Sequence, residues 1–268
     1  MSYALKSTGI LQEIGESVKA AVEVKKNKVP ESSLKELASS RVSPPKDFCV
    51  PFGREGLNVI AEVKKASPSQ GPIAPELDHV TVASDYLKSG AQAISVLTEP
   101  KYFGGDVSFL QDIRKAHPEA YLLMKDFFVD SYQLQEALAF GADAILIIVS
   151  LLGPEQSGDL YKKAMALGLT PLVEVHDAAE MDAAIDFGAQ LIGINNRDLK
   201  TLKTSIDTSF SLIKKSVSKC TFIAESGLNS HEQLVALNEA GCHGFLVGTS
   251  LMKTGTPGMA LKRLLGAG

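Results

Sequence analysis

Cysteine is scarce in this 268-residue sequence, which contains only Cys49, Cys220 and Cys242. Their spacing fits neither a zinc site nor a disulfide framework, and free thiols are typical of a reducing compartment. Cys242 lies in an apolar stretch, so we expect it in the core. The residues after Met1 lack the basic start and apolar run of a secretory signal. We therefore expect a cytoplasmic protein, and no group of potential ligands has the spacing of a metal site.

Long runs of one kind of residue are also missing. No stretch of lysine and arginine suggests a nucleic-acid partner, and the formal net charge is −4. No apolar stretch approaches the roughly 18 residues that a membrane-spanning helix requires. Neither the glycine-rich dinucleotide fingerprint nor a Walker loop is present. We therefore expect no nucleic acid and no membrane as partner, while a few local cations remain sufficient to bind a phosphate.

An internal repeat is the clearest pattern in the sequence. Gly90, Gly141, Gly188 and Gly241 each follow a helical pattern, and each is followed by a small residue and then an apolar run. Glycine is favoured at the left-handed position after a helix because it has no Cβ to clash. The four glycines are 51, 47 and 53 residues apart, a spacing that suits two strand–helix units. Four such segments therefore predict eight units.

The apolar runs predict the strands. They are short and mostly continuous, as is typical of parallel strands that are covered on both faces. The predicted strands are 59–63, 93–97, 121–124, 144–149, 172–175, 191–194, 222–224 and 245–247, and helical patterns include 85–89, 132–140, 178–187 and 231–240. Alternating strands and helices without hairpin turns indicate a parallel α/β sheet. Eight even units favour a (β/α)8 TIM barrel, which commonly has about 250 residues, over an open doubly wound sheet.

The N-terminal part of the sequence does not follow the repeat. An apolar stripe at helical spacing is formed by Ile10, Leu11, Ile14 and Val18. A second helix is predicted to start near Pro30, because proline suits the first helical position. We interpret the proline-rich segment 42–52 as a linker. We expect residues 1–55 to be extra N-terminal helices that cap a barrel of residues 56–268 in a single domain; a mobile tail is the alternative.

Ionisable residues and a few other polar residues gather where the predicted strands end, which is where a TIM barrel carries its chemistry. They are Glu62 and Lys64, Lys125 and Asp126, Glu174 and His176, Asn195, Asn196 and Arg197, and Glu225 with Ser226. Unpaired buried charge is costly, so this many groups at one rim predict a functional site. Glu62, Lys125 and Glu174 adjoin apolar runs and are the best candidates. His176 fits a helix start better than a catalyst, and Arg197 fits an ion pair as well as a substrate clamp.

Glycine and hydroxyl residues follow three of the predicted strands. They are Ser226 and Gly227, then Gly248, Thr249 and Ser250, and the segment 67–71 near the first strand. Barrels often bind phosphate with the loops after their last two strands, where backbone N–H groups and hydroxyl groups donate to the oxygens. The residues by themselves therefore predict acid–base chemistry on a small phosphorylated molecule and do not identify that molecule.

Six stretches at the strand ends carry more specific motifs. They are 61–69 (AEVKKASPS), 94–105 (ISVLTEPKYFGG), 125–127 (KDF), 173–176 (VEVH), 194–199 (INNRDL) and 224–227 (AESG). In this order they resemble the motifs of the indole-3-glycerol-phosphate synthase family, and the resemblance covers about residues 5–265. It implies a lyase of tryptophan biosynthesis that works without a cofactor. Its reaction turns 1-(2-carboxyphenylamino)-1-deoxyribulose 5-phosphate into indole-3-glycerol phosphate, CO2 and water.

The resemblance implies roles for the ionisable residues. Lys125 is expected to be the acid in ring closure. Glu174 is expected to stabilise positive charge on the aniline nitrogen or to transfer a proton. Glu62 and Lys64 are expected to serve the dehydration, and Glu225 resembles a further active-site acid that organises the others. Which lysine donates which proton stays open.

The resemblance also implies contacts with a small phosphorylated aromatic substrate. Asn195 is expected to hold a chain hydroxyl, Arg197 to orient the anthranilate carboxylate, and Phe127 to line the aromatic pocket. Ser226 is expected to contact the substrate. The residues expected to bind its phosphate are Ser67, Ser226, Gly227, Gly248 and Thr249. We expect a monomer, with a weak homodimer as the alternative.

Two other hypotheses fit parts of this pattern. A barrel like phosphoribosylanthranilate isomerase would share the phosphate site, but it normally uses a cysteine in its first strand, where this sequence has Glu62 and Lys64. A non-catalytic phosphate-binding barrel would keep the phosphate loops and lose the acid–base residues, whereas Lys125 and Glu174 are present.

Overall fold

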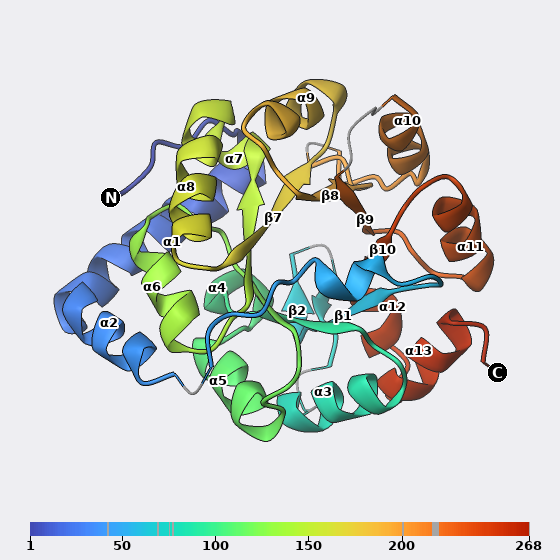
Figure 1. The fold of residues 1–268 in the computed structure, drawn as a ribbon, viewed down its shortest axis with the longest axis horizontal. Coiled ribbons are helices and arrows are strands. Elements are labelled where there is room, and N and C mark those ends of the chain that lie inside the picture. Colours follow the sequence, from blue (N-terminus) through green and yellow to red (C-terminus); the bar gives the residue numbers. More distant parts are fainter. Residues whose placement is uncertain are drawn as a thin grey trace.

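A closed barrel of parallel strands forms the centre of the computed structural model (Figure 1), and it confirms the predicted TIM barrel. The structure describes residues 1–41, 43–68, 70–74, 76, 78–199, 201–215 and 220–267. The barrel strands are β1 (Val59–Val63), β4 (Ala93–Leu97), β5 (Leu122–Lys125), β6 (Ala144–Ile148), β7 (Thr170–Val175), β8 (Leu191–Asn195), β9 (Thr221–Glu225) and β10 (Gly244–Val247). Each pairs with its neighbour in the chain, and β10 closes the barrel on β1.

The barrel strands are buried on both faces, which accounts for their continuous apolar runs. β1 and β4 have the predicted bounds, and the other strands differ by one or two residues at an end. Lys125, Asn195 and Glu225 extend their strands beyond the apolar run. Backbone hydrogen bonds define a strand, so a polar side chain can occupy its last position and point into the site.

Helices form an outer ring around the strands (Figure 1). They are α3 (His79–Lys88), α5 (Val107–Ala116), α6 (Tyr132–Ala139), α8 (Pro154–Ala166), α9 (Ala178–Asp186), α10 (Asp207–Lys215), α11 (His231–Glu239) and α13 (Pro257–Leu264). Three shorter helices, α4 (Pro100–Phe103), α7 (Val149–Leu152) and α12 (Thr249–Met252), follow β4, β6 and β10. The repeat glycines Gly90, Gly141, Gly188 and Gly241 have φ values of 101°, 93°, 88° and 105°, which confirms the predicted left-handed positions. Cys242 is buried in the core, as predicted.

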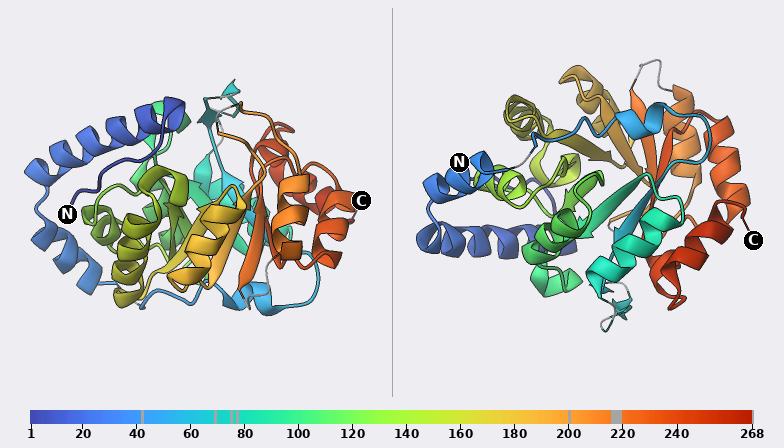
Figure 2. Two further views of the ribbon diagram at one scale, coloured as in Figure 1. Left: turned by 90° about the horizontal axis from the view of Figure 1, so that it is seen from above. Right: turned by 60° about the horizontal axis from the view of Figure 1, so that its bottom comes forward.

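The N-terminal extension is helical. α1 (Gly9–Lys28) buries one stripe, which consists of Leu11, Ile14, Gly15, Val18 and Val22. α2 (Glu31–Ser39) begins directly after Pro30 and packs against α6. Figure 2 (left) shows α1 lying across one end of the barrel while α2 runs down its side. In the described part of the chain, no helix combines the length and the apolar character needed to span a bilayer.

The segment 42–52 is more than the linker that the sequence suggested. It leads into a 3-10 helix, η1 (Val50–Gly53), and the Phe48 and Phe52 side chains are fully buried with ring centroids 5.8 Å apart. The Phe48 backbone N–H donates to the side chain of the threonine that begins β7 (3.1 Å), and Phe52 packs against the start of β10. This segment therefore closes the amino end of the barrel. Val42 lies outside the described residues.

A short hairpin in the loop after β1 departs from the predicted pattern. Its strands, β2 (Ala66–Ser67) and β3 (Gly71–Pro72), are antiparallel and separate from the barrel. The expectation of no hairpin turn is wrong here, because two-residue strands are too short to leave a periodic signal. Ser69 lies outside the described residues. The hairpin stands at the same end of the barrel as α1 (Figure 2, left).

A buried carboxylate at the start of β6 ties the extension to the barrel. Asp143 is fully buried, and its two oxygens lie 2.7 Å from the Arg41 guanidinium and 2.5 Å from that of Arg114. Its oxygens also accept hydrogen bonds from the backbone N–H groups of Lys46 (3.1 Å) and Leu122 (2.9 Å). One side chain thus joins the N-terminal segment, α5 and β5.

We expect Asp143→Ala to lower the free energy of unfolding by about 3 kcal/mol, the lower end of the range for breaking a buried ion pair. The reason is that two partly buried arginines would lose their counter-charge. The melting temperature should fall by roughly 6–12 °C for a chain of this size. Thermal unfolding followed by circular dichroism measures the change. Lys35→Ala, which breaks an exposed pair with Glu31, is the control and should have almost no effect.

Candidate active site

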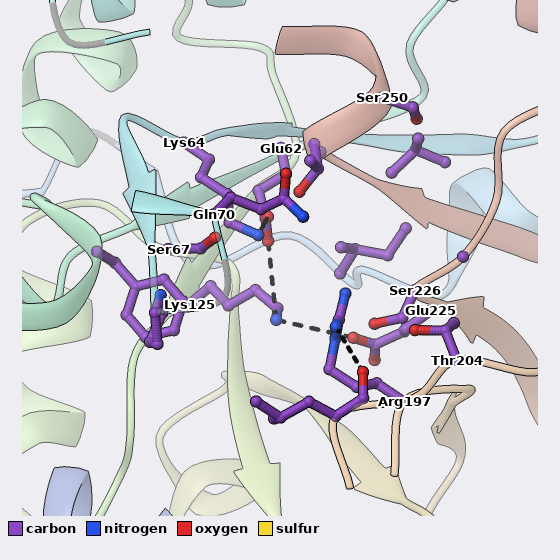
Figure 3. A pocket seen from close by; sticks show the side chains of 18 of the residues that line it. Glu62, Lys64, Ser67, Gln70, Lys125, Arg197, Thr204, Glu225, Ser226 and Ser250 are labelled. Carbon is purple, nitrogen blue, oxygen red and sulfur yellow. Dashed lines mark hydrogen bonds and ion pairs between the residues drawn. The ribbon is translucent and has the colours of Figure 1, made fainter. Parts of the chain in front are cut away.

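A cavity of about 460 Å³ opens at the carboxyl ends of the barrel strands (Figure 3). The strand ends contribute Glu62, Lys64, Lys125 and Glu225. Apolar residues of α1 line the same cavity, so the N-terminal extension is one of its walls. Further lining residues come from the loops: Ser67, Pro68, Gln70, Phe103, Phe127, Arg197, Leu199, Leu202, Thr204, Ser226, Gly227, Leu228, Asn229, Gly248, Thr249, Ser250 and Lys253.

A chain of ion pairs crosses the cavity floor. The Lys64 ammonium group lies 2.7 Å from Glu62 Oε1, and the Lys125 ammonium group lies 3.7 Å from Glu62 Oε2 and 3.8 Å from Glu225 Oε2. Figure 3 shows Lys125 reaching between the two carboxylates, which come from opposite sides of it. Lys125 is therefore held between two acids at the place where a substrate would bind.

Two glycines make room for these carboxylates. A Cβ at Gly248 would collide with the Glu62 side chain, and a Cβ at Gly193 would collide with Glu225 Oε1. Gly193 was not identified from the sequence, because its role depends on a side chain from the neighbouring strand. Gly248 thus has a second reason to be glycine beyond the predicted approach to phosphate.

Burial and neighbouring charges set the protonation states of this group. Burial opposes ionisation of Glu62, but the ammonium groups of Lys64 and Lys125 outweigh it and lower the pKa of Glu62. Burial likewise opposes the charge on Lys125, but Glu62, Glu225 and Glu174 outweigh it and raise its pKa. Burial, followed by repulsion from Glu174, raises the pKa of Glu225 to about 8. The two carboxyl groups therefore differ: the raised pKa of Glu225 favours its protonated form, and the lowered pKa of Glu62 favours its ionised form.

Glu174 and Asn195, both predicted as catalytic, do not line the cavity. Glu174 is buried, and its Oε1 accepts a hydrogen bond from Asn195 Nδ2 (3.1 Å) and lies 3.2 Å from His176 Nε2. Asn195 is the strand partner of Glu225. Burial would raise the pKa of Glu174, but the bond and charge of His176 lower it to about 2. Glu174 still acts on the ion-pair chain electrostatically, because its charge raises the pKa of Lys125 and of Glu225.

One wall of the cavity is aromatic. The rings of Phe127 and Phe103 have centroids 5.8 Å apart, and the Lys64 ammonium group lies 5.9 Å from the Phe103 centroid. Phe103 was not named as a site residue, although it falls inside the motif of residues 94–105. Its neighbour in sequence, Gly104, ends α4 in the left-handed region and turns the chain there (φ 62°).

Arg197 also lines the cavity. Its backbone N–H donates to Asn195 Oδ1 (3.0 Å), and its Nη1 donates to the Leu202 carbonyl oxygen (3.1 Å). Among the described residues it has no carboxylate partner, which argues against the structural ion pair that the sequence left open. Its guanidinium group is thus positioned by backbone atoms and remains available for an anion.

The loop after β9 has the strained geometry of a binding turn. Ser226 and Gly227 both have positive φ values (66° and 76°), and the Ser226 carbonyl oxygen accepts a hydrogen bond from Asn196 Nδ2 (3.1 Å). A serine in the left-handed region is uncommon and tends to mark a functional site. Across the cavity, the buried Ser67 hydroxyl has no hydrogen-bond partner in the described chain.

The loop after β10 completes this side of the cavity. Gly248 precedes α12, which begins at Thr249, and Ser250 Oγ donates to the Leu228 carbonyl oxygen (3.0 Å), joining the last two loops. Lys253 follows one turn later, lines the cavity and forms no ion pair within the described ranges. The sequence motifs do not point to Lys253, which directly follows α12 four residues after Thr249. All five predicted phosphate residues therefore lie on one cavity.

These features define a TIM-barrel enzyme with acid–base chemistry at its strand ends: the closed barrel, the ion-pair chain, and the glycine and hydroxyl residues of the loops after β9 and β10. The family model for indole-3-glycerol phosphate synthase matches residues 11–264. The chain is 41% identical to the indole-3-glycerol phosphate synthase of Salinibacter ruber, over 97% of this chain and 96% of that protein. It is 43% identical to that of Magnetococcus marinus, over 96% of this chain and 98% of that protein. The chain belongs to the indole-3-glycerol phosphate synthase family.

Solved structures with lower identity share the fold. The tryptophan synthase alpha chain from Legionella pneumophila superposes with a TM-score of 0.61 at 16% identity, over 82% of this chain and 96% of that one. The 3-hexulose-6-phosphate synthase from Salmonella typhimurium gives a TM-score of 0.62 at 12% identity, over 79% and 98%. At these identities the likeness concerns the barrel and says nothing of the substrate.

Proposed function

We propose that this protein closes the indole ring of 1-(2-carboxyphenylamino)-1-deoxyribulose 5-phosphate and releases indole-3-glycerol phosphate, CO2 and water. The observation that carries the proposal is the position of Lys125 between Glu62 and Glu225. The same cavity is lined by the loops after β9 and β10, which are the expected phosphate-binding loops. Membership of the family supports the same reaction. No metal or cofactor is needed for these steps.

Ring closure needs an acid at the ketone oxygen of the sugar chain. The ring carbon that bears the carboxylate attacks the ketone carbon, and the oxygen takes up a proton as the new bond forms. We assign this proton to the Lys125 ammonium group, which reaches the centre of the cavity (Figure 3). Glu174 supplies negative charge from behind as positive charge develops on the aniline nitrogen. Loss of CO2 then restores the aromatic ring.

Dehydration needs an acid for the departing hydroxyl and a base for the proton lost with it. Glu62 is ionised between two lysines and is suited to accept the proton, while Lys64 lies 2.7 Å away and can relay it. The raised pKa of Glu225 favours its protonated form, which makes it a second donor beside Lys125. Glu225, as the acid, and Glu62, as the base, therefore lie on opposite sides of Lys125.

Substrate binding divides between two ends of the cavity. Phe127 and Phe103 offer a face for the aromatic ring, and Arg197 offers a cation for its carboxylate. Asn195 is assigned to a hydroxyl group of the sugar chain, although its side chain is not one of those that line the cavity. The phosphate is assigned to Ser67, Ser226, Gly227, Gly248 and Thr249, with Lys253 as an added cation.

The test of this function is to add the purified protein to the proposed substrate and follow the fluorescence of indole-glycerol phosphate. Growth of the signal with release of one CO2 per product supports the proposal. No growth with intact substrate binding would show that the barrel has another reaction. A protein that neither binds nor converts the compound would reject the substrate itself.

Glu225 gives a pH dependence that tests its role as an acid. Its proton is present below a pKa of about 8 and is lost as the pH rises through that value. We expect kcat/KM, which reports the free enzyme, to fall on the alkaline side with a midpoint near that pKa. Glu225→Gln keeps a hydrogen-bond donor without a transferable proton. It should lower kcat by about 10²-fold and remove this alkaline limb.

The control for this experiment is Glu239→Gln, an exposed change at the end of α11 that should leave the pH profile unaltered. Glu225 would lose its assignment as an acid if the alkaline limb of Glu225→Gln matched that of the unmodified protein.

We also propose a cytoplasmic monomer. The three cysteines are unpaired, as in proteins of reducing compartments. Sedimentation at assay concentrations distinguishes the monomer from a weak homodimer.

A further inference from the structure

His176 lies outside the cavity, in the turn between β7 and α9, and both of its ring nitrogens face carboxylates. Nε2 is 3.2 Å from Glu174 Oε1, and Nδ1 is 3.1 Å from Glu180 Oε2. The His176 backbone N–H also donates to Glu180 Oε2 (2.8 Å), which fixes that carboxylate on the first turns of α9. The ring is mostly buried, so its orientation is held by these contacts and by packing.

This arrangement requires a particular protonation state. A neutral imidazole has one nitrogen with a lone pair, and that nitrogen would lie within 3.2 Å of a carboxylate oxygen, which can only accept. The imidazolium form donates a hydrogen bond at Nδ1 to Glu180 and places its positive charge 3.2 Å from Glu174 Oε1, a contact that is an ion pair without hydrogen-bond geometry. Burial opposes this charge, but Glu174 and Glu180 outweigh it and raise the pKa of His176 to about 10. The geometry and the electrostatics therefore agree on a cation.

The other groups around His176 are few. Ser150, on α7, has its hydroxyl 3.5 Å from Nδ1 and carries no charge. Glu225, on β9, acts on it only at longer range. With Glu225 protonated, the described cluster has three anions (Glu62, Glu174 and Glu180) and three cations (Lys64, Lys125 and His176). Removing the imidazolium would leave Glu174 as a buried acid beside other acids.

We propose that His176, held by Glu180, is a positioning residue that keeps Glu174 ionised and aimed at the reacting nitrogen. Glu174 Oε1 accepts a hydrogen bond from Asn195 and forms the ion pair with His176, whereas Oε2 accepts no hydrogen bond within the described chain. Oε2 is thus the oxygen left to act on the substrate. The proposal rests on the ring-closing function above. It also gives a role to His176, which the motif 173–176 leaves without one.

The test replaces His176 with glutamine, which can donate one hydrogen bond and carries no charge. Without the imidazolium the pKa of Glu174 should rise, so its ionised form is lost at a higher pH. The acidic limb of the kcat–pH profile should move up by at least about one unit, which is about a tenfold loss of kcat at the pH of the original limb. KM should change little, because His176 does not line the cavity.

A second variant and a spectroscopic measurement keep the proposal testable if His176→Gln folds poorly. Glu180→Gln should move the same limb in the same direction by a smaller amount, since Glu174 still holds the ring. Nitrogen-15 NMR of histidine-labelled protein at pH 8 should show both ring nitrogens of His176 protonated. His79→Gln, which alters a histidine paired with Asp112 on the outer helices, is the control and should leave the profile unchanged.

Two results would overturn the proposal. One is a neutral His176 tautomer at pH 8 in the unmodified protein. The other is an equal fall in kcat at every pH, which is what a merely structural role predicts. Absence of any turnover by the unmodified protein would instead reject the ring-closing function, and the NMR measurement would still report the state of His176.

Discussion

Replacing Lys125 with alanine is expected to lower kcat by about 10³-fold, within the range that general acid catalysis contributes. Its ammonium group bridges Glu62 and Glu225 at 3.7 and 3.8 Å and is the donor assigned to the ketone oxygen. Alanine removes the proton and the cation that stabilises the new oxygen charge. Initial rates of product fluorescence at saturating substrate measure the loss.

Binding should survive this change, because the phosphate loops and the aromatic wall use other residues. KM and competitive inhibition by the product should therefore stay near their original values, so that kcat and kcat/KM fall together. Lys262→Ala, an exposed change on α13, is the matched control and should retain the original rate. A Lys125→Ala rate within about tenfold of the original would remove Lys125 from the acid role.

Glu174→Gln is expected to lower kcat by about 10²-fold or more, although the side chain does not line the cavity. Glutamine has nearly the same shape and can still accept from Asn195, so the variant changes charge with little change in packing. Charge on Glu174 matters because it stabilises the positive aniline nitrogen and balances His176 and Lys125. Single-turnover rates of ring closure isolate the affected step.

The distinction between charge and shape decides this second result. Glu174→Asp keeps the charge on a shorter side chain and should retain more activity than Glu174→Gln. The exposed Glu239→Gln should behave like the unmodified protein. If Glu174→Gln closed the ring at nearly the original rate, the ionised carboxylate would have no part in the step, and the proposal for His176 would lose its target as well.

The barrel could be predicted because its signals are local. Apolar runs such as 93–97 are continuous since both faces of a central strand are covered, and Gly90 or Gly141 marks the end of a helix through its own backbone conformation. Helix starts were less visible. The helical pattern at 85–89 covers only the last part of α3, which begins at His79 behind an Asp78 cap.

The candidate site was predictable as a set of strand-end residues and less so as a geometry. Position after a strand placed Glu62, Lys125 and Glu225 at one rim, and the structure brings them into one ion-pair chain. The same argument treated Glu174 as equivalent, yet it does not line the cavity and its Oε1 lies 3.2 Å from His176. Strand position determines the end of the barrel at which a residue lies, whereas packing around the barrel determines which side chains face the opening.

The sequence by itself determined the eight strand–helix units, the extra N-terminal helices, the family and the residue types available for acid–base chemistry. Each of these depends on periodicity, on turn residues or on motifs read along the chain. The tertiary structure decided that Phe48 and Phe52 close the amino end of the barrel, that Gly193 makes room for Glu225, and that burial and the charge of Glu174 raise the pKa of Glu225. These features depend on contacts between residues far apart in sequence, where distance and burial set the energy of a charge, and neither quantity is encoded in local pattern.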